Sequence, residues 1–318
     1  MHRLLAAVLL CLGLALPAAA RAQYTAAAGR SAPMEAVDSV TRDAKTGQLQ
    51  HQTVYVPPKR DPHGNAHGHQ YDLAVDGAFE GQTVAVLHLY TGMGFDFSLP
   101  RGALAEKGFS VYRWINRAPS PEELARGLEK ANQLWIISGD SQQLSARHVA
   151  VIKKFFDAGH GVYLWGDNPP YLGDANLVAK ALLDGAYLTP DSYVQGEKVV
   201  GMQDKPGQPG LRPNHLITTG LEHLYEGHTI PTIVLDKKSS QALEPLIVGS
   251  AGNLVAASYD RGGKRAILDG GFTRLYMVWD TAGTARYVKN AAAWLANAER
   301  FGNTVVARKP PTSTQPQQ

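Results

Sequence analysis

The sequence contains very little cysteine: the only one among its 318 residues is Cys11. Cys11 lies in an apolar run, 4–16, that follows a basic start at 1–3 and precedes an A-x-A cleavage pattern at 20–22. This arrangement predicts a signal peptide at 1–22, so we expect a periplasmic or secreted mature chain. That mature chain would have no thiol, which excludes disulfides, zinc–thiolate sites and cysteine nucleophiles.

Long apolar runs and a strong net charge are also missing from the rest of the chain. No run after the signal peptide has the roughly 20 apolar residues that a transmembrane helix needs. The formal charge is +3, and it becomes +1 when Arg3 and Arg21 leave with the signal peptide. A charge this close to zero gives no indication of nucleic-acid binding. With 44% hydrophobic and 19% charged residues, the composition is that of an ordinary globular protein.

The two ends of the mature chain have few apolar runs. Residues 23–81 contain a loop rich in glycine and histidine at 61–69 and one short strand signal at 53–56. We expect this region to form an extended arm or an irregular subdomain. Residues 299–318 end in a polar, proline-containing stretch, and we expect a disordered tail there.

Between these ends, residues 82–298 alternate between β-rich and amphipathic segments. Apolar runs typical of buried parallel strands lie at 83–90, 109–115, 133–138 and 162–165. Helical patterns follow them at 98–107, 121–131, 145–158 and 175–183, with a last one at 284–298. This alternation predicts an α/β fold: a doubly wound, mainly parallel sheet with helices on both faces. Late strands at 254–259 and 265–269, joined by Gly262-Gly263, predict an antiparallel hairpin at one edge.

Three stretches resemble one family. QLWIISGDSQQLSARHVAVIKKFFDAGHGVYLWGDN at 133–168, NHLITTGLEHLYEG at 214–227 and the closing segment 262–297 are similar to class I glutamine-amidotransferase-like (flavodoxin-like) domains. The resemblance covers roughly 82–297 and is closest to the non-catalytic branch. In the active members, the turn after the fourth strand holds a nucleophilic cysteine. This chain has GDNPP at 166–170 instead, so the resemblance implies a fold without glutaminase chemistry.

Polar residues at the ends of the predicted strands form the candidate crevice. Asp140 and Asp167 each follow a strand, and parallel strands bring such ends to one edge of the sheet. The full set of candidate residues is Asp96, Asp140, Ser141, Trp165, Asp167, Asn168 and Tyr171. Carboxylates there could bind a hard cation such as Mg²⁺ or Ca²⁺, or sugar hydroxyls, beside the aromatic rings. The alternative is that each aspartate only caps a turn and each ring packs in the core.

His63, His67 and His69 form a second candidate site. Their spacing, H-x₃-H-x-H, is compatible with Zn²⁺ or Cu²⁺ binding by imidazole. The alternative is a solvated loop that happens to contain histidine.

Three functional hypotheses follow. The leading one is an exported, non-catalytic domain that binds a small molecule or an envelope protein partner at the crevice, with no cofactor. The second is a carboxylate-assisted hydrolase of envelope or extracellular carbohydrate, in which a divalent cation could take part. In the third, the arm at 23–81 adds to a partner or to a second copy of the chain.

Overall fold

The computed structural model describes residues 24–279 and 282–301. The expected signal peptide therefore lies outside the described residues, as does 302–318 of the expected tail. The first residues of that tail are helical, in α7 (Ala298–Phe301). Arg265 accounts for this difference, because its guanidinium donates to Glu299 Oε2 at 2.8 Å and holds the helix against the body.

The centre of the molecule is an eight-stranded sheet in the order β4-β3-β5-β6-β14-β13-β12-β9. Its parallel part comprises β3 (Thr83–His88), β4 (Ser110–Ile115), β5 (Gln133–Ile137), β6 (Gly161–Trp165) and β14 (Lys264–Asp269). The antiparallel part comprises β13 (Leu254–Arg261), β12 (Leu243–Val248) and β9 (Gly210–Leu211). The expected fold class is confirmed, including the late hairpin that joins β13 to β14.

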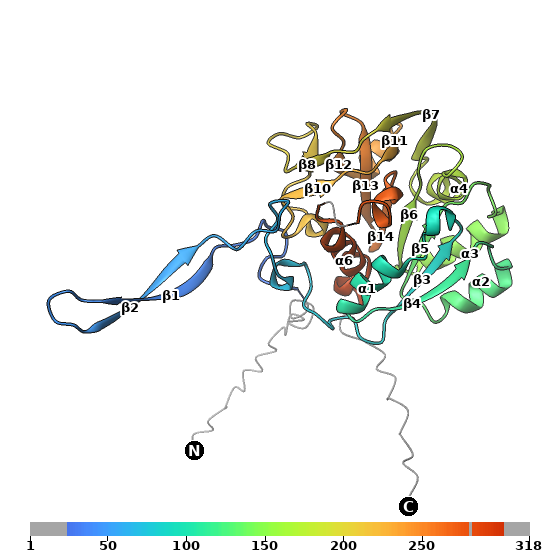
Figure 1. Cartoon of the computed structure of the whole chain (residues 1–318). Helices are drawn as coiled ribbons and strands as arrows, with labels where there is room; N and C mark the ends of the chain where they lie inside the picture. The colour runs from blue at the N-terminus through green and yellow to red at the C-terminus, as the bar shows by residue number, and fades with distance from the viewer. Residues whose placement is uncertain (1–23, 280–281, 302–318) are drawn as a thin grey trace, which may run out of the picture.

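Helices cover both faces of the sheet. On one face lie α1 (Ser98–Glu106) and α6 (Thr284–Leu295), which contact each other (Figure 1). On the other face lie α2 (Pro121–Leu128), α3 (Ala146–Asp157) and α4 (Gly173–Leu182). Strand β3 serves both layers: Val84 and Val86 pack in the first core, and Ala85 and Leu87 in the second. A strand covered on both sides must be apolar at every position, which explains its continuous hydrophobic run.

Local sequence signals place the helix starts. Ser120 Oγ accepts the backbone N–H of Glu123 at 3.2 Å, and Pro121 occupies the first turn of α2. Ser145 begins α3 in the same way, with His148 in the reciprocal capping position.

Smaller elements surround one side of this core. Two further two-stranded sheets pair β7 (Tyr187–Gln195) with β11 (Thr229–Val234) and β8 (Val199–Gly201) with β10 (His223–Tyr225). Short helices complete the set: η2 (His69–Tyr71), η3 (Gly92–Gly94), η4 (Leu216–Thr218), α5 (Ser239–Ala242) and η5 (Phe272–Leu275). None of the helices in the described part of the chain has the length and apolar character needed to cross a membrane.

The N-terminal region divides into two parts. A hairpin of β1 (Glu35–Arg42) and β2 (Leu49–Val56) projects from the body, and the expected strand at 53–56 is the end of β2 (Figure 1). The chain from 57 to 81 instead lies on the body, where Leu73 and Phe79 are fully buried in the first core. This part packs on the body as an irregular segment, because its few apolar residues enter the core and its Asp72 forms ion pairs.

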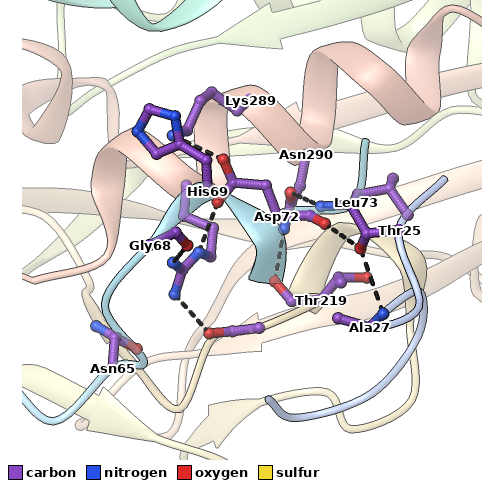
Figure 2. A network of polar contacts seen from close by, with 12 residues as sticks. Thr25, Ala27, Asn65, Gly68, His69, Asp72, Leu73, Thr219, Lys289 and Asn290 are labelled. Carbon is purple, nitrogen blue, oxygen red and sulfur yellow. Dashed lines mark hydrogen bonds and ion pairs between the residues drawn. The ribbon is translucent and has the colours of Figure 1, made fainter. Parts of the chain in front are cut away.

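The pairing centres on Asp72. Its carboxylate contacts Lys107 Nζ at 2.9 Å, Lys289 Nζ at 2.8 Å and Arg286 Nε at 2.7 Å. The next backbone N–H, that of Leu73, donates to Asn290 Oδ1 at 2.7 Å. Figure 2 shows part of this network, with Asp72 beside residues of α6. The network joins the N-terminal region to α1 and α6.

Candidate functional site

Two adjacent cavities lie beyond the carboxyl ends of the parallel strands. The larger, of about 500 Å³, is lined by Leu89, Tyr90, Thr91, Gly92, Met93, Asn116, Asp140, Gln143 and Tyr171. The smaller, of about 280 Å³, is lined by Met93, Gly94, Phe95, Asp96, Ser98, Leu99, Pro100, Leu275 and Tyr276. Met93 belongs to both, so we call the two cavities together the crevice. Its position agrees with the general rule for ligand sites in open α/β sheets.

The wall of the larger cavity is formed by the segments that follow β3, β4 and β5. The chain after β3 passes close to Gly139, where a Cβ would lie only 2.6 Å from the carbonyl oxygen of Leu89. Asn116 follows β4 with φ of 64°, and its side chain is hydrogen-bonded to Thr91. Gln143 then fixes the Asn116 backbone, because its Nε2 donates to the Asn116 carbonyl at 2.9 Å. These contacts hold the polar lining in place.

Asp140 is the carboxylate of the larger cavity. It is exposed, and its Oδ1 accepts the Ser141 hydroxyl at 3.1 Å. The residues that line the crevice, all in the described part of the chain, include no lysine, arginine or histidine. The negative charge of Asp140 is therefore not neutralised by a neighbouring cation in the crevice.

A group of aromatic rings separates the crevice from the sheet. Tyr90 has its ring centroid 5.1 Å from those of Tyr171 and Phe272, and the Tyr276 hydroxyl lies 3.3 Å from that of Tyr90. Tyr171 and Tyr90 face the larger cavity, and Tyr276 faces the smaller one. The crevice thus combines ring surfaces with carboxylate and amide groups.

Asp167 lies behind these rings and lines neither cavity, contrary to the sequence prediction. It is almost completely buried, and the N–H of Asn168 donates to its Oδ1 at 2.8 Å. The Thr229 hydroxyl lies 2.9 Å from the same oxygen. Burial raises the pKa of Asp167 to about 7, against the smaller lowering effect of these two hydrogen bonds. Asn168, which is within 2.8 Å of Thr229 Oγ1, also stays outside the lining.

The charge of Asp167 nevertheless affects one residue of the crevice, Tyr276. Burial and the hydrogen bond with Tyr90 are the main causes that raise the pKa of Tyr276, and the nearby Asp167 carboxylate adds to them. Asp167 is therefore close enough to Tyr276 for its charge to act on the Tyr276 hydroxyl, although it lines neither cavity.

Asp96 and Ser141 have local roles. Asp96 lines the smaller cavity, and its Oδ1 accepts the backbone N–H of Ser98 at 2.8 Å, at the start of α1. The hydrogen bonds to Ser98 lower the pKa of Asp96. Ser141 lines neither cavity and supports Asp140.

Trp165 was expected in the crevice but belongs to the core. Its side chain is 0% exposed and packs on Tyr163, with ring centroids 4.1 Å apart, and on Trp135. The reason is that β6 is buried on both faces, so its last residue points into a helix-covered layer. Asp269, which ends β14, is buried there too, in an ion pair with Arg274.

The expected histidine metal site is not formed. No group of three or more His, Cys, Asp or Glu residues is placed to hold a metal ion in the part of the chain that the structure describes. His69 instead contacts Asp76 at 2.9 Å and Glu106 at 3.5 Å, beside the Asp72 network. The crevice carboxylates likewise form no group of three in the described part of the chain, and the possible divalent cation stays a prediction.

The lining residues that the sequence prediction missed include Tyr90, Asn116, Gln143 and Tyr276. A signal existed for the middle two: Asn116 directly follows the strand expected at 109–115, and Gln143 lies three residues after Asp140. Tyr276 lies far along the chain in an irregular segment, and only the folded structure brings it here.

Comparison with known proteins gives distant structural likenesses, three of which are described. No family model matches the chain, and no curated protein does. The solved structures include the exo-β-1,4-mannosidase Op5Man5 from Opitutaceae bacterium strain TAV5, at 12% identity and a TM-score of 0.38, over 69% of this chain and 36% of the mannosidase. A putative ThuA-like protein from Parabacteroides merdae ATCC 43184 is 10% identical, with a TM-score of 0.43 over 68% of this chain and 89% of that protein.

A third solved structure is Agd3, described as a novel carbohydrate deacetylase. It is 13% identical, with a TM-score of 0.41 over 68% of this chain and 32% of Agd3. The chain thus spans about a third of the mannosidase and of the deacetylase. At these identities and TM-scores, neither the family nor the activity of this chain follows from the likeness.

Proposed function

We propose that the chain is an exported binding protein with a glutamine-amidotransferase-like fold, and that its crevice binds a neutral, hydroxyl-rich ligand such as a saccharide. The observation that carries this proposal is the lining of the 500 Å³ cavity. Asp140, Asn116 and Gln143 supply hydrogen-bonding groups there, beside the rings of Tyr90 and Tyr171. The volume is within the range of small-molecule sites.

The chemistry of the lining supports a neutral polyol. A carboxylate accepts hydroxyl protons, amides both donate and accept, and tyrosine rings offer apolar faces for the C–H surfaces of a sugar. Phosphate or carboxylate ligands would need arginine or lysine to compensate their charge. The described crevice lining offers neither.

Two observations favour binding over turnover. The sequence after the expected signal peptide has no cysteine, so the family's thioester chemistry is unavailable. The turn at 166–170 is also closed by its own hydrogen bonds, with Asp167 N–H donating to the Tyr171 carbonyl at 2.8 Å. The sequence of that turn, GDNPP, contains no serine, threonine or cysteine.

A second candidate function is a hydrolase of carbohydrate. The observation in its favour is the pKa of Asp167, raised to about 7, because a carboxyl group that holds a proton near neutral pH can act as a general acid. Asp140 would supply the second carboxyl group. This function requires Tyr276 and its neighbours to move aside, so that Asp167 reaches a bound ligand.

The test is a ligand titration of the mature protein by calorimetry against neutral, amino and acidic saccharides. We expect saturable binding of a neutral saccharide, weakened about tenfold or more by Asp140→Asn and by Tyr171→Ala. Asp204→Asn, an exposed aspartate in the loop between β8 and β9, is the matched control and should bind normally. Preference for an acidic or a cationic ligand would contradict the proposal. Turnover that Asp167→Asn abolishes, with binding intact, would establish the second candidate instead.

A further inference from the structure

The β1–β2 hairpin is the one part of the described chain that forms a sheet without helical cover or a neighbouring strand. Each strand is eight residues long, and the two pair only with each other. Figure 1 shows the hairpin reaching away from the body. Apolar side chains are exposed along it: Val37 (42%), Val40 (50%), Leu49 (57%) and Tyr55 (69%). A lone hairpin of this kind is only marginally stable in water, so a further strand would stabilise it.

The two edges of the hairpin differ in charge. Strand β1, EAVDSVTR, carries Glu35, Asp38 and Arg42. Strand β2, LQHQTVYV, has no aspartate, glutamate, lysine, arginine or proline. Charged residues and proline are the usual means by which proteins prevent strand-to-strand association at an open edge. The β2 edge lacks both, whereas the large sheet ends on one side in β9, which is only two residues long.

The sequence of β2 is compatible with pairing to itself. A two-fold axis perpendicular to the hairpin keeps equivalent faces together and makes the two β2 strands antiparallel. With Gln52 on that axis, Leu49 lies opposite Tyr55 of the second copy, and Gln50 opposite Val54 of the second copy. Aromatic and aliphatic residues opposite each other stabilise a strand pair, and no charges meet.

Two positions of the axis on the β1 edge bring like charges together. A two-fold axis at Asp38 places that carboxylate opposite its own copy. An axis at Ser39 places Glu35 opposite Asp43 of the second copy. Like charges directly opposite each other destabilise a strand pair. An axis at Val40 instead places Asp38 opposite Arg42 of the second copy, so charge alone does not exclude β1. The β2 edge is the stronger candidate because it has none of the charged residues or proline that protect an open edge.

We propose that the free edge of β2 is a docking site for a second copy of this chain. The two hairpins form a four-stranded antiparallel sheet in which the two β2 strands are central. The residues that line the crevice all lie in the body, between 89 and 143 or at 171, 275 and 276, so both crevices stay outside the shared sheet. A contact between two strands is small, and the dimer should dissociate on dilution.

The test is sedimentation of the mature protein over a range of concentrations. We expect a reversible monomer–dimer equilibrium, shifted several-fold toward the monomer by Gln52→Lys, which places two like charges on the axis. Thr41→Lys adds the same charge to β1, the strand away from the proposed contact, and should leave the dimer intact. Mixing Gln52→Lys with Gln52→Glu should restore a dimer, which would exclude misfolding as the cause of the loss.

A cysteine cross-link gives an independent readout, because the expected mature chain has no thiol of its own. Gln52→Cys should form a disulfide between two copies under mild oxidation, since residues opposite each other in an antiparallel pair are within reach of one. Thr41→Cys should not. A monomer at every concentration would overturn the proposal, and so would equal cross-linking at both positions. A dimer that Thr41→Lys weakens as much as Gln52→Lys would assign the contact to β1 and likewise overturn it.

Discussion

Asp72 and Asp167 are both buried aspartates, with exposed fractions of 0% and 3%, but their surroundings differ in charge. Asp72 is in contact with two lysines and an arginine. Asp167 accepts hydrogen bonds from neutral groups. Burial alone raises the pKa of both carboxyl groups. At Asp72, however, Lys289, Lys107 and Arg286 outweigh burial and hold the pKa below its usual range.

This difference separates a structural carboxylate from a candidate functional one. Asp72 is permanently ionised at neutral pH and fastens the N-terminal region to α1 and α6. Asp167 exchanges its proton near pH 7 and contributes no ion pair that the fold depends on. Buried groups with perturbed pKa values are found in both roles, so the partners rather than the burial decide between them.

Asp72→Asn should have the largest effect on stability. The substitution leaves Lys107, which is 1% exposed, and Lys289 with one carboxylate fewer. Removing one partner of a buried ion pair costs about 3–5 kcal/mol, and urea unfolding at pH 7 measures it. In the matched control, Asp157→Asn, the exposed pairs with Lys153 and Lys264 are lost, and the cost should stay below about 1 kcal/mol. Equal costs would show that Asp72 does not act through its cations.

The pH dependence of the wild type gives a second check on Asp72. Because its pKa is lowered on folding, its contribution is complete above the unfolded value of about 3.9 and is lost as the pH falls through the folded pKa. Acid unfolding curves of wild type and Asp72→Asn should therefore converge at low pH. A gap that stays constant down to the acid transition would contradict this assignment.

The pairing between Asp72 and Lys107 should appear as a coupling energy. The double variant Asp72→Asn/Lys107→Met should lose less stability than the two single variants lose together, by about 1 kcal/mol or more. The reason is that the second substitution removes a charge that the first leaves unpaired. Asp72→Asn combined with Lys153→Met, on the exposed face of α3, should be additive within about 0.5 kcal/mol.

Asp167→Asn should have a smaller effect of the opposite sign. The pKa rises from 3.8 to about 7 on folding, so the folded state retains a proton that the unfolded state loses, and the free energy of unfolding falls between about pH 4 and pH 7. The full shift corresponds to roughly 4 kcal/mol at most. Asparagine keeps an oxygen for Asn168 N–H and Thr229, so the variant should lose this slope and be at least as stable as wild type at pH 8. A slope unchanged in the variant would assign the proton to another group.

The fold could be predicted from the sequence because its signals are local. Ser120, Pro121 and Glu123 mark the start of α2 within four residues, and each parallel strand is a continuous apolar run. Strand β7 was missed because its pattern is interrupted at Pro190, a residue that normally argues against a strand interior.

The candidate site could be predicted only in part, because its decisive contacts are distant in sequence. The position of Asp140 follows from the end of β5, but the burial of Asp167 depends on Thr229, 62 residues later. The three cations around Asp72 come from positions up to 217 residues away, and the stretch around Asp72 itself has no periodic pattern to indicate packing. Trp165 was placed wrongly because strand ends show no sign of which face a ring will occupy.

Asp140→Asn completes the comparison with the smallest expected change in stability. The side chain is exposed, and its Oδ1 accepts the Ser141 hydroxyl. The amide oxygen of asparagine can accept the same hydroxyl. Urea unfolding should change by no more than about 0.5 kcal/mol. The same substitution should weaken ligand binding, because a neutral amide accepts hydroxyl protons less strongly than a carboxylate does.

The three variants make one chemical change, from carboxylate to amide, at three positions. If the effect on stability follows the cations around each aspartate and then its burial, the order is Asp72, then Asp167 with its reversed sign, then Asp140. Binding should follow a different order, with Asp140 first, because only Asp140 faces the larger cavity. A loss of binding in Asp72→Asn under conditions where that variant is fully folded would mean that the N-terminal network also shapes the crevice. If ligand binding is kept in Asp72→Asn and Asp167→Asn and lost in Asp140→Asn, Asp140 is the aspartate that contacts the ligand, and the two buried aspartates act on stability alone.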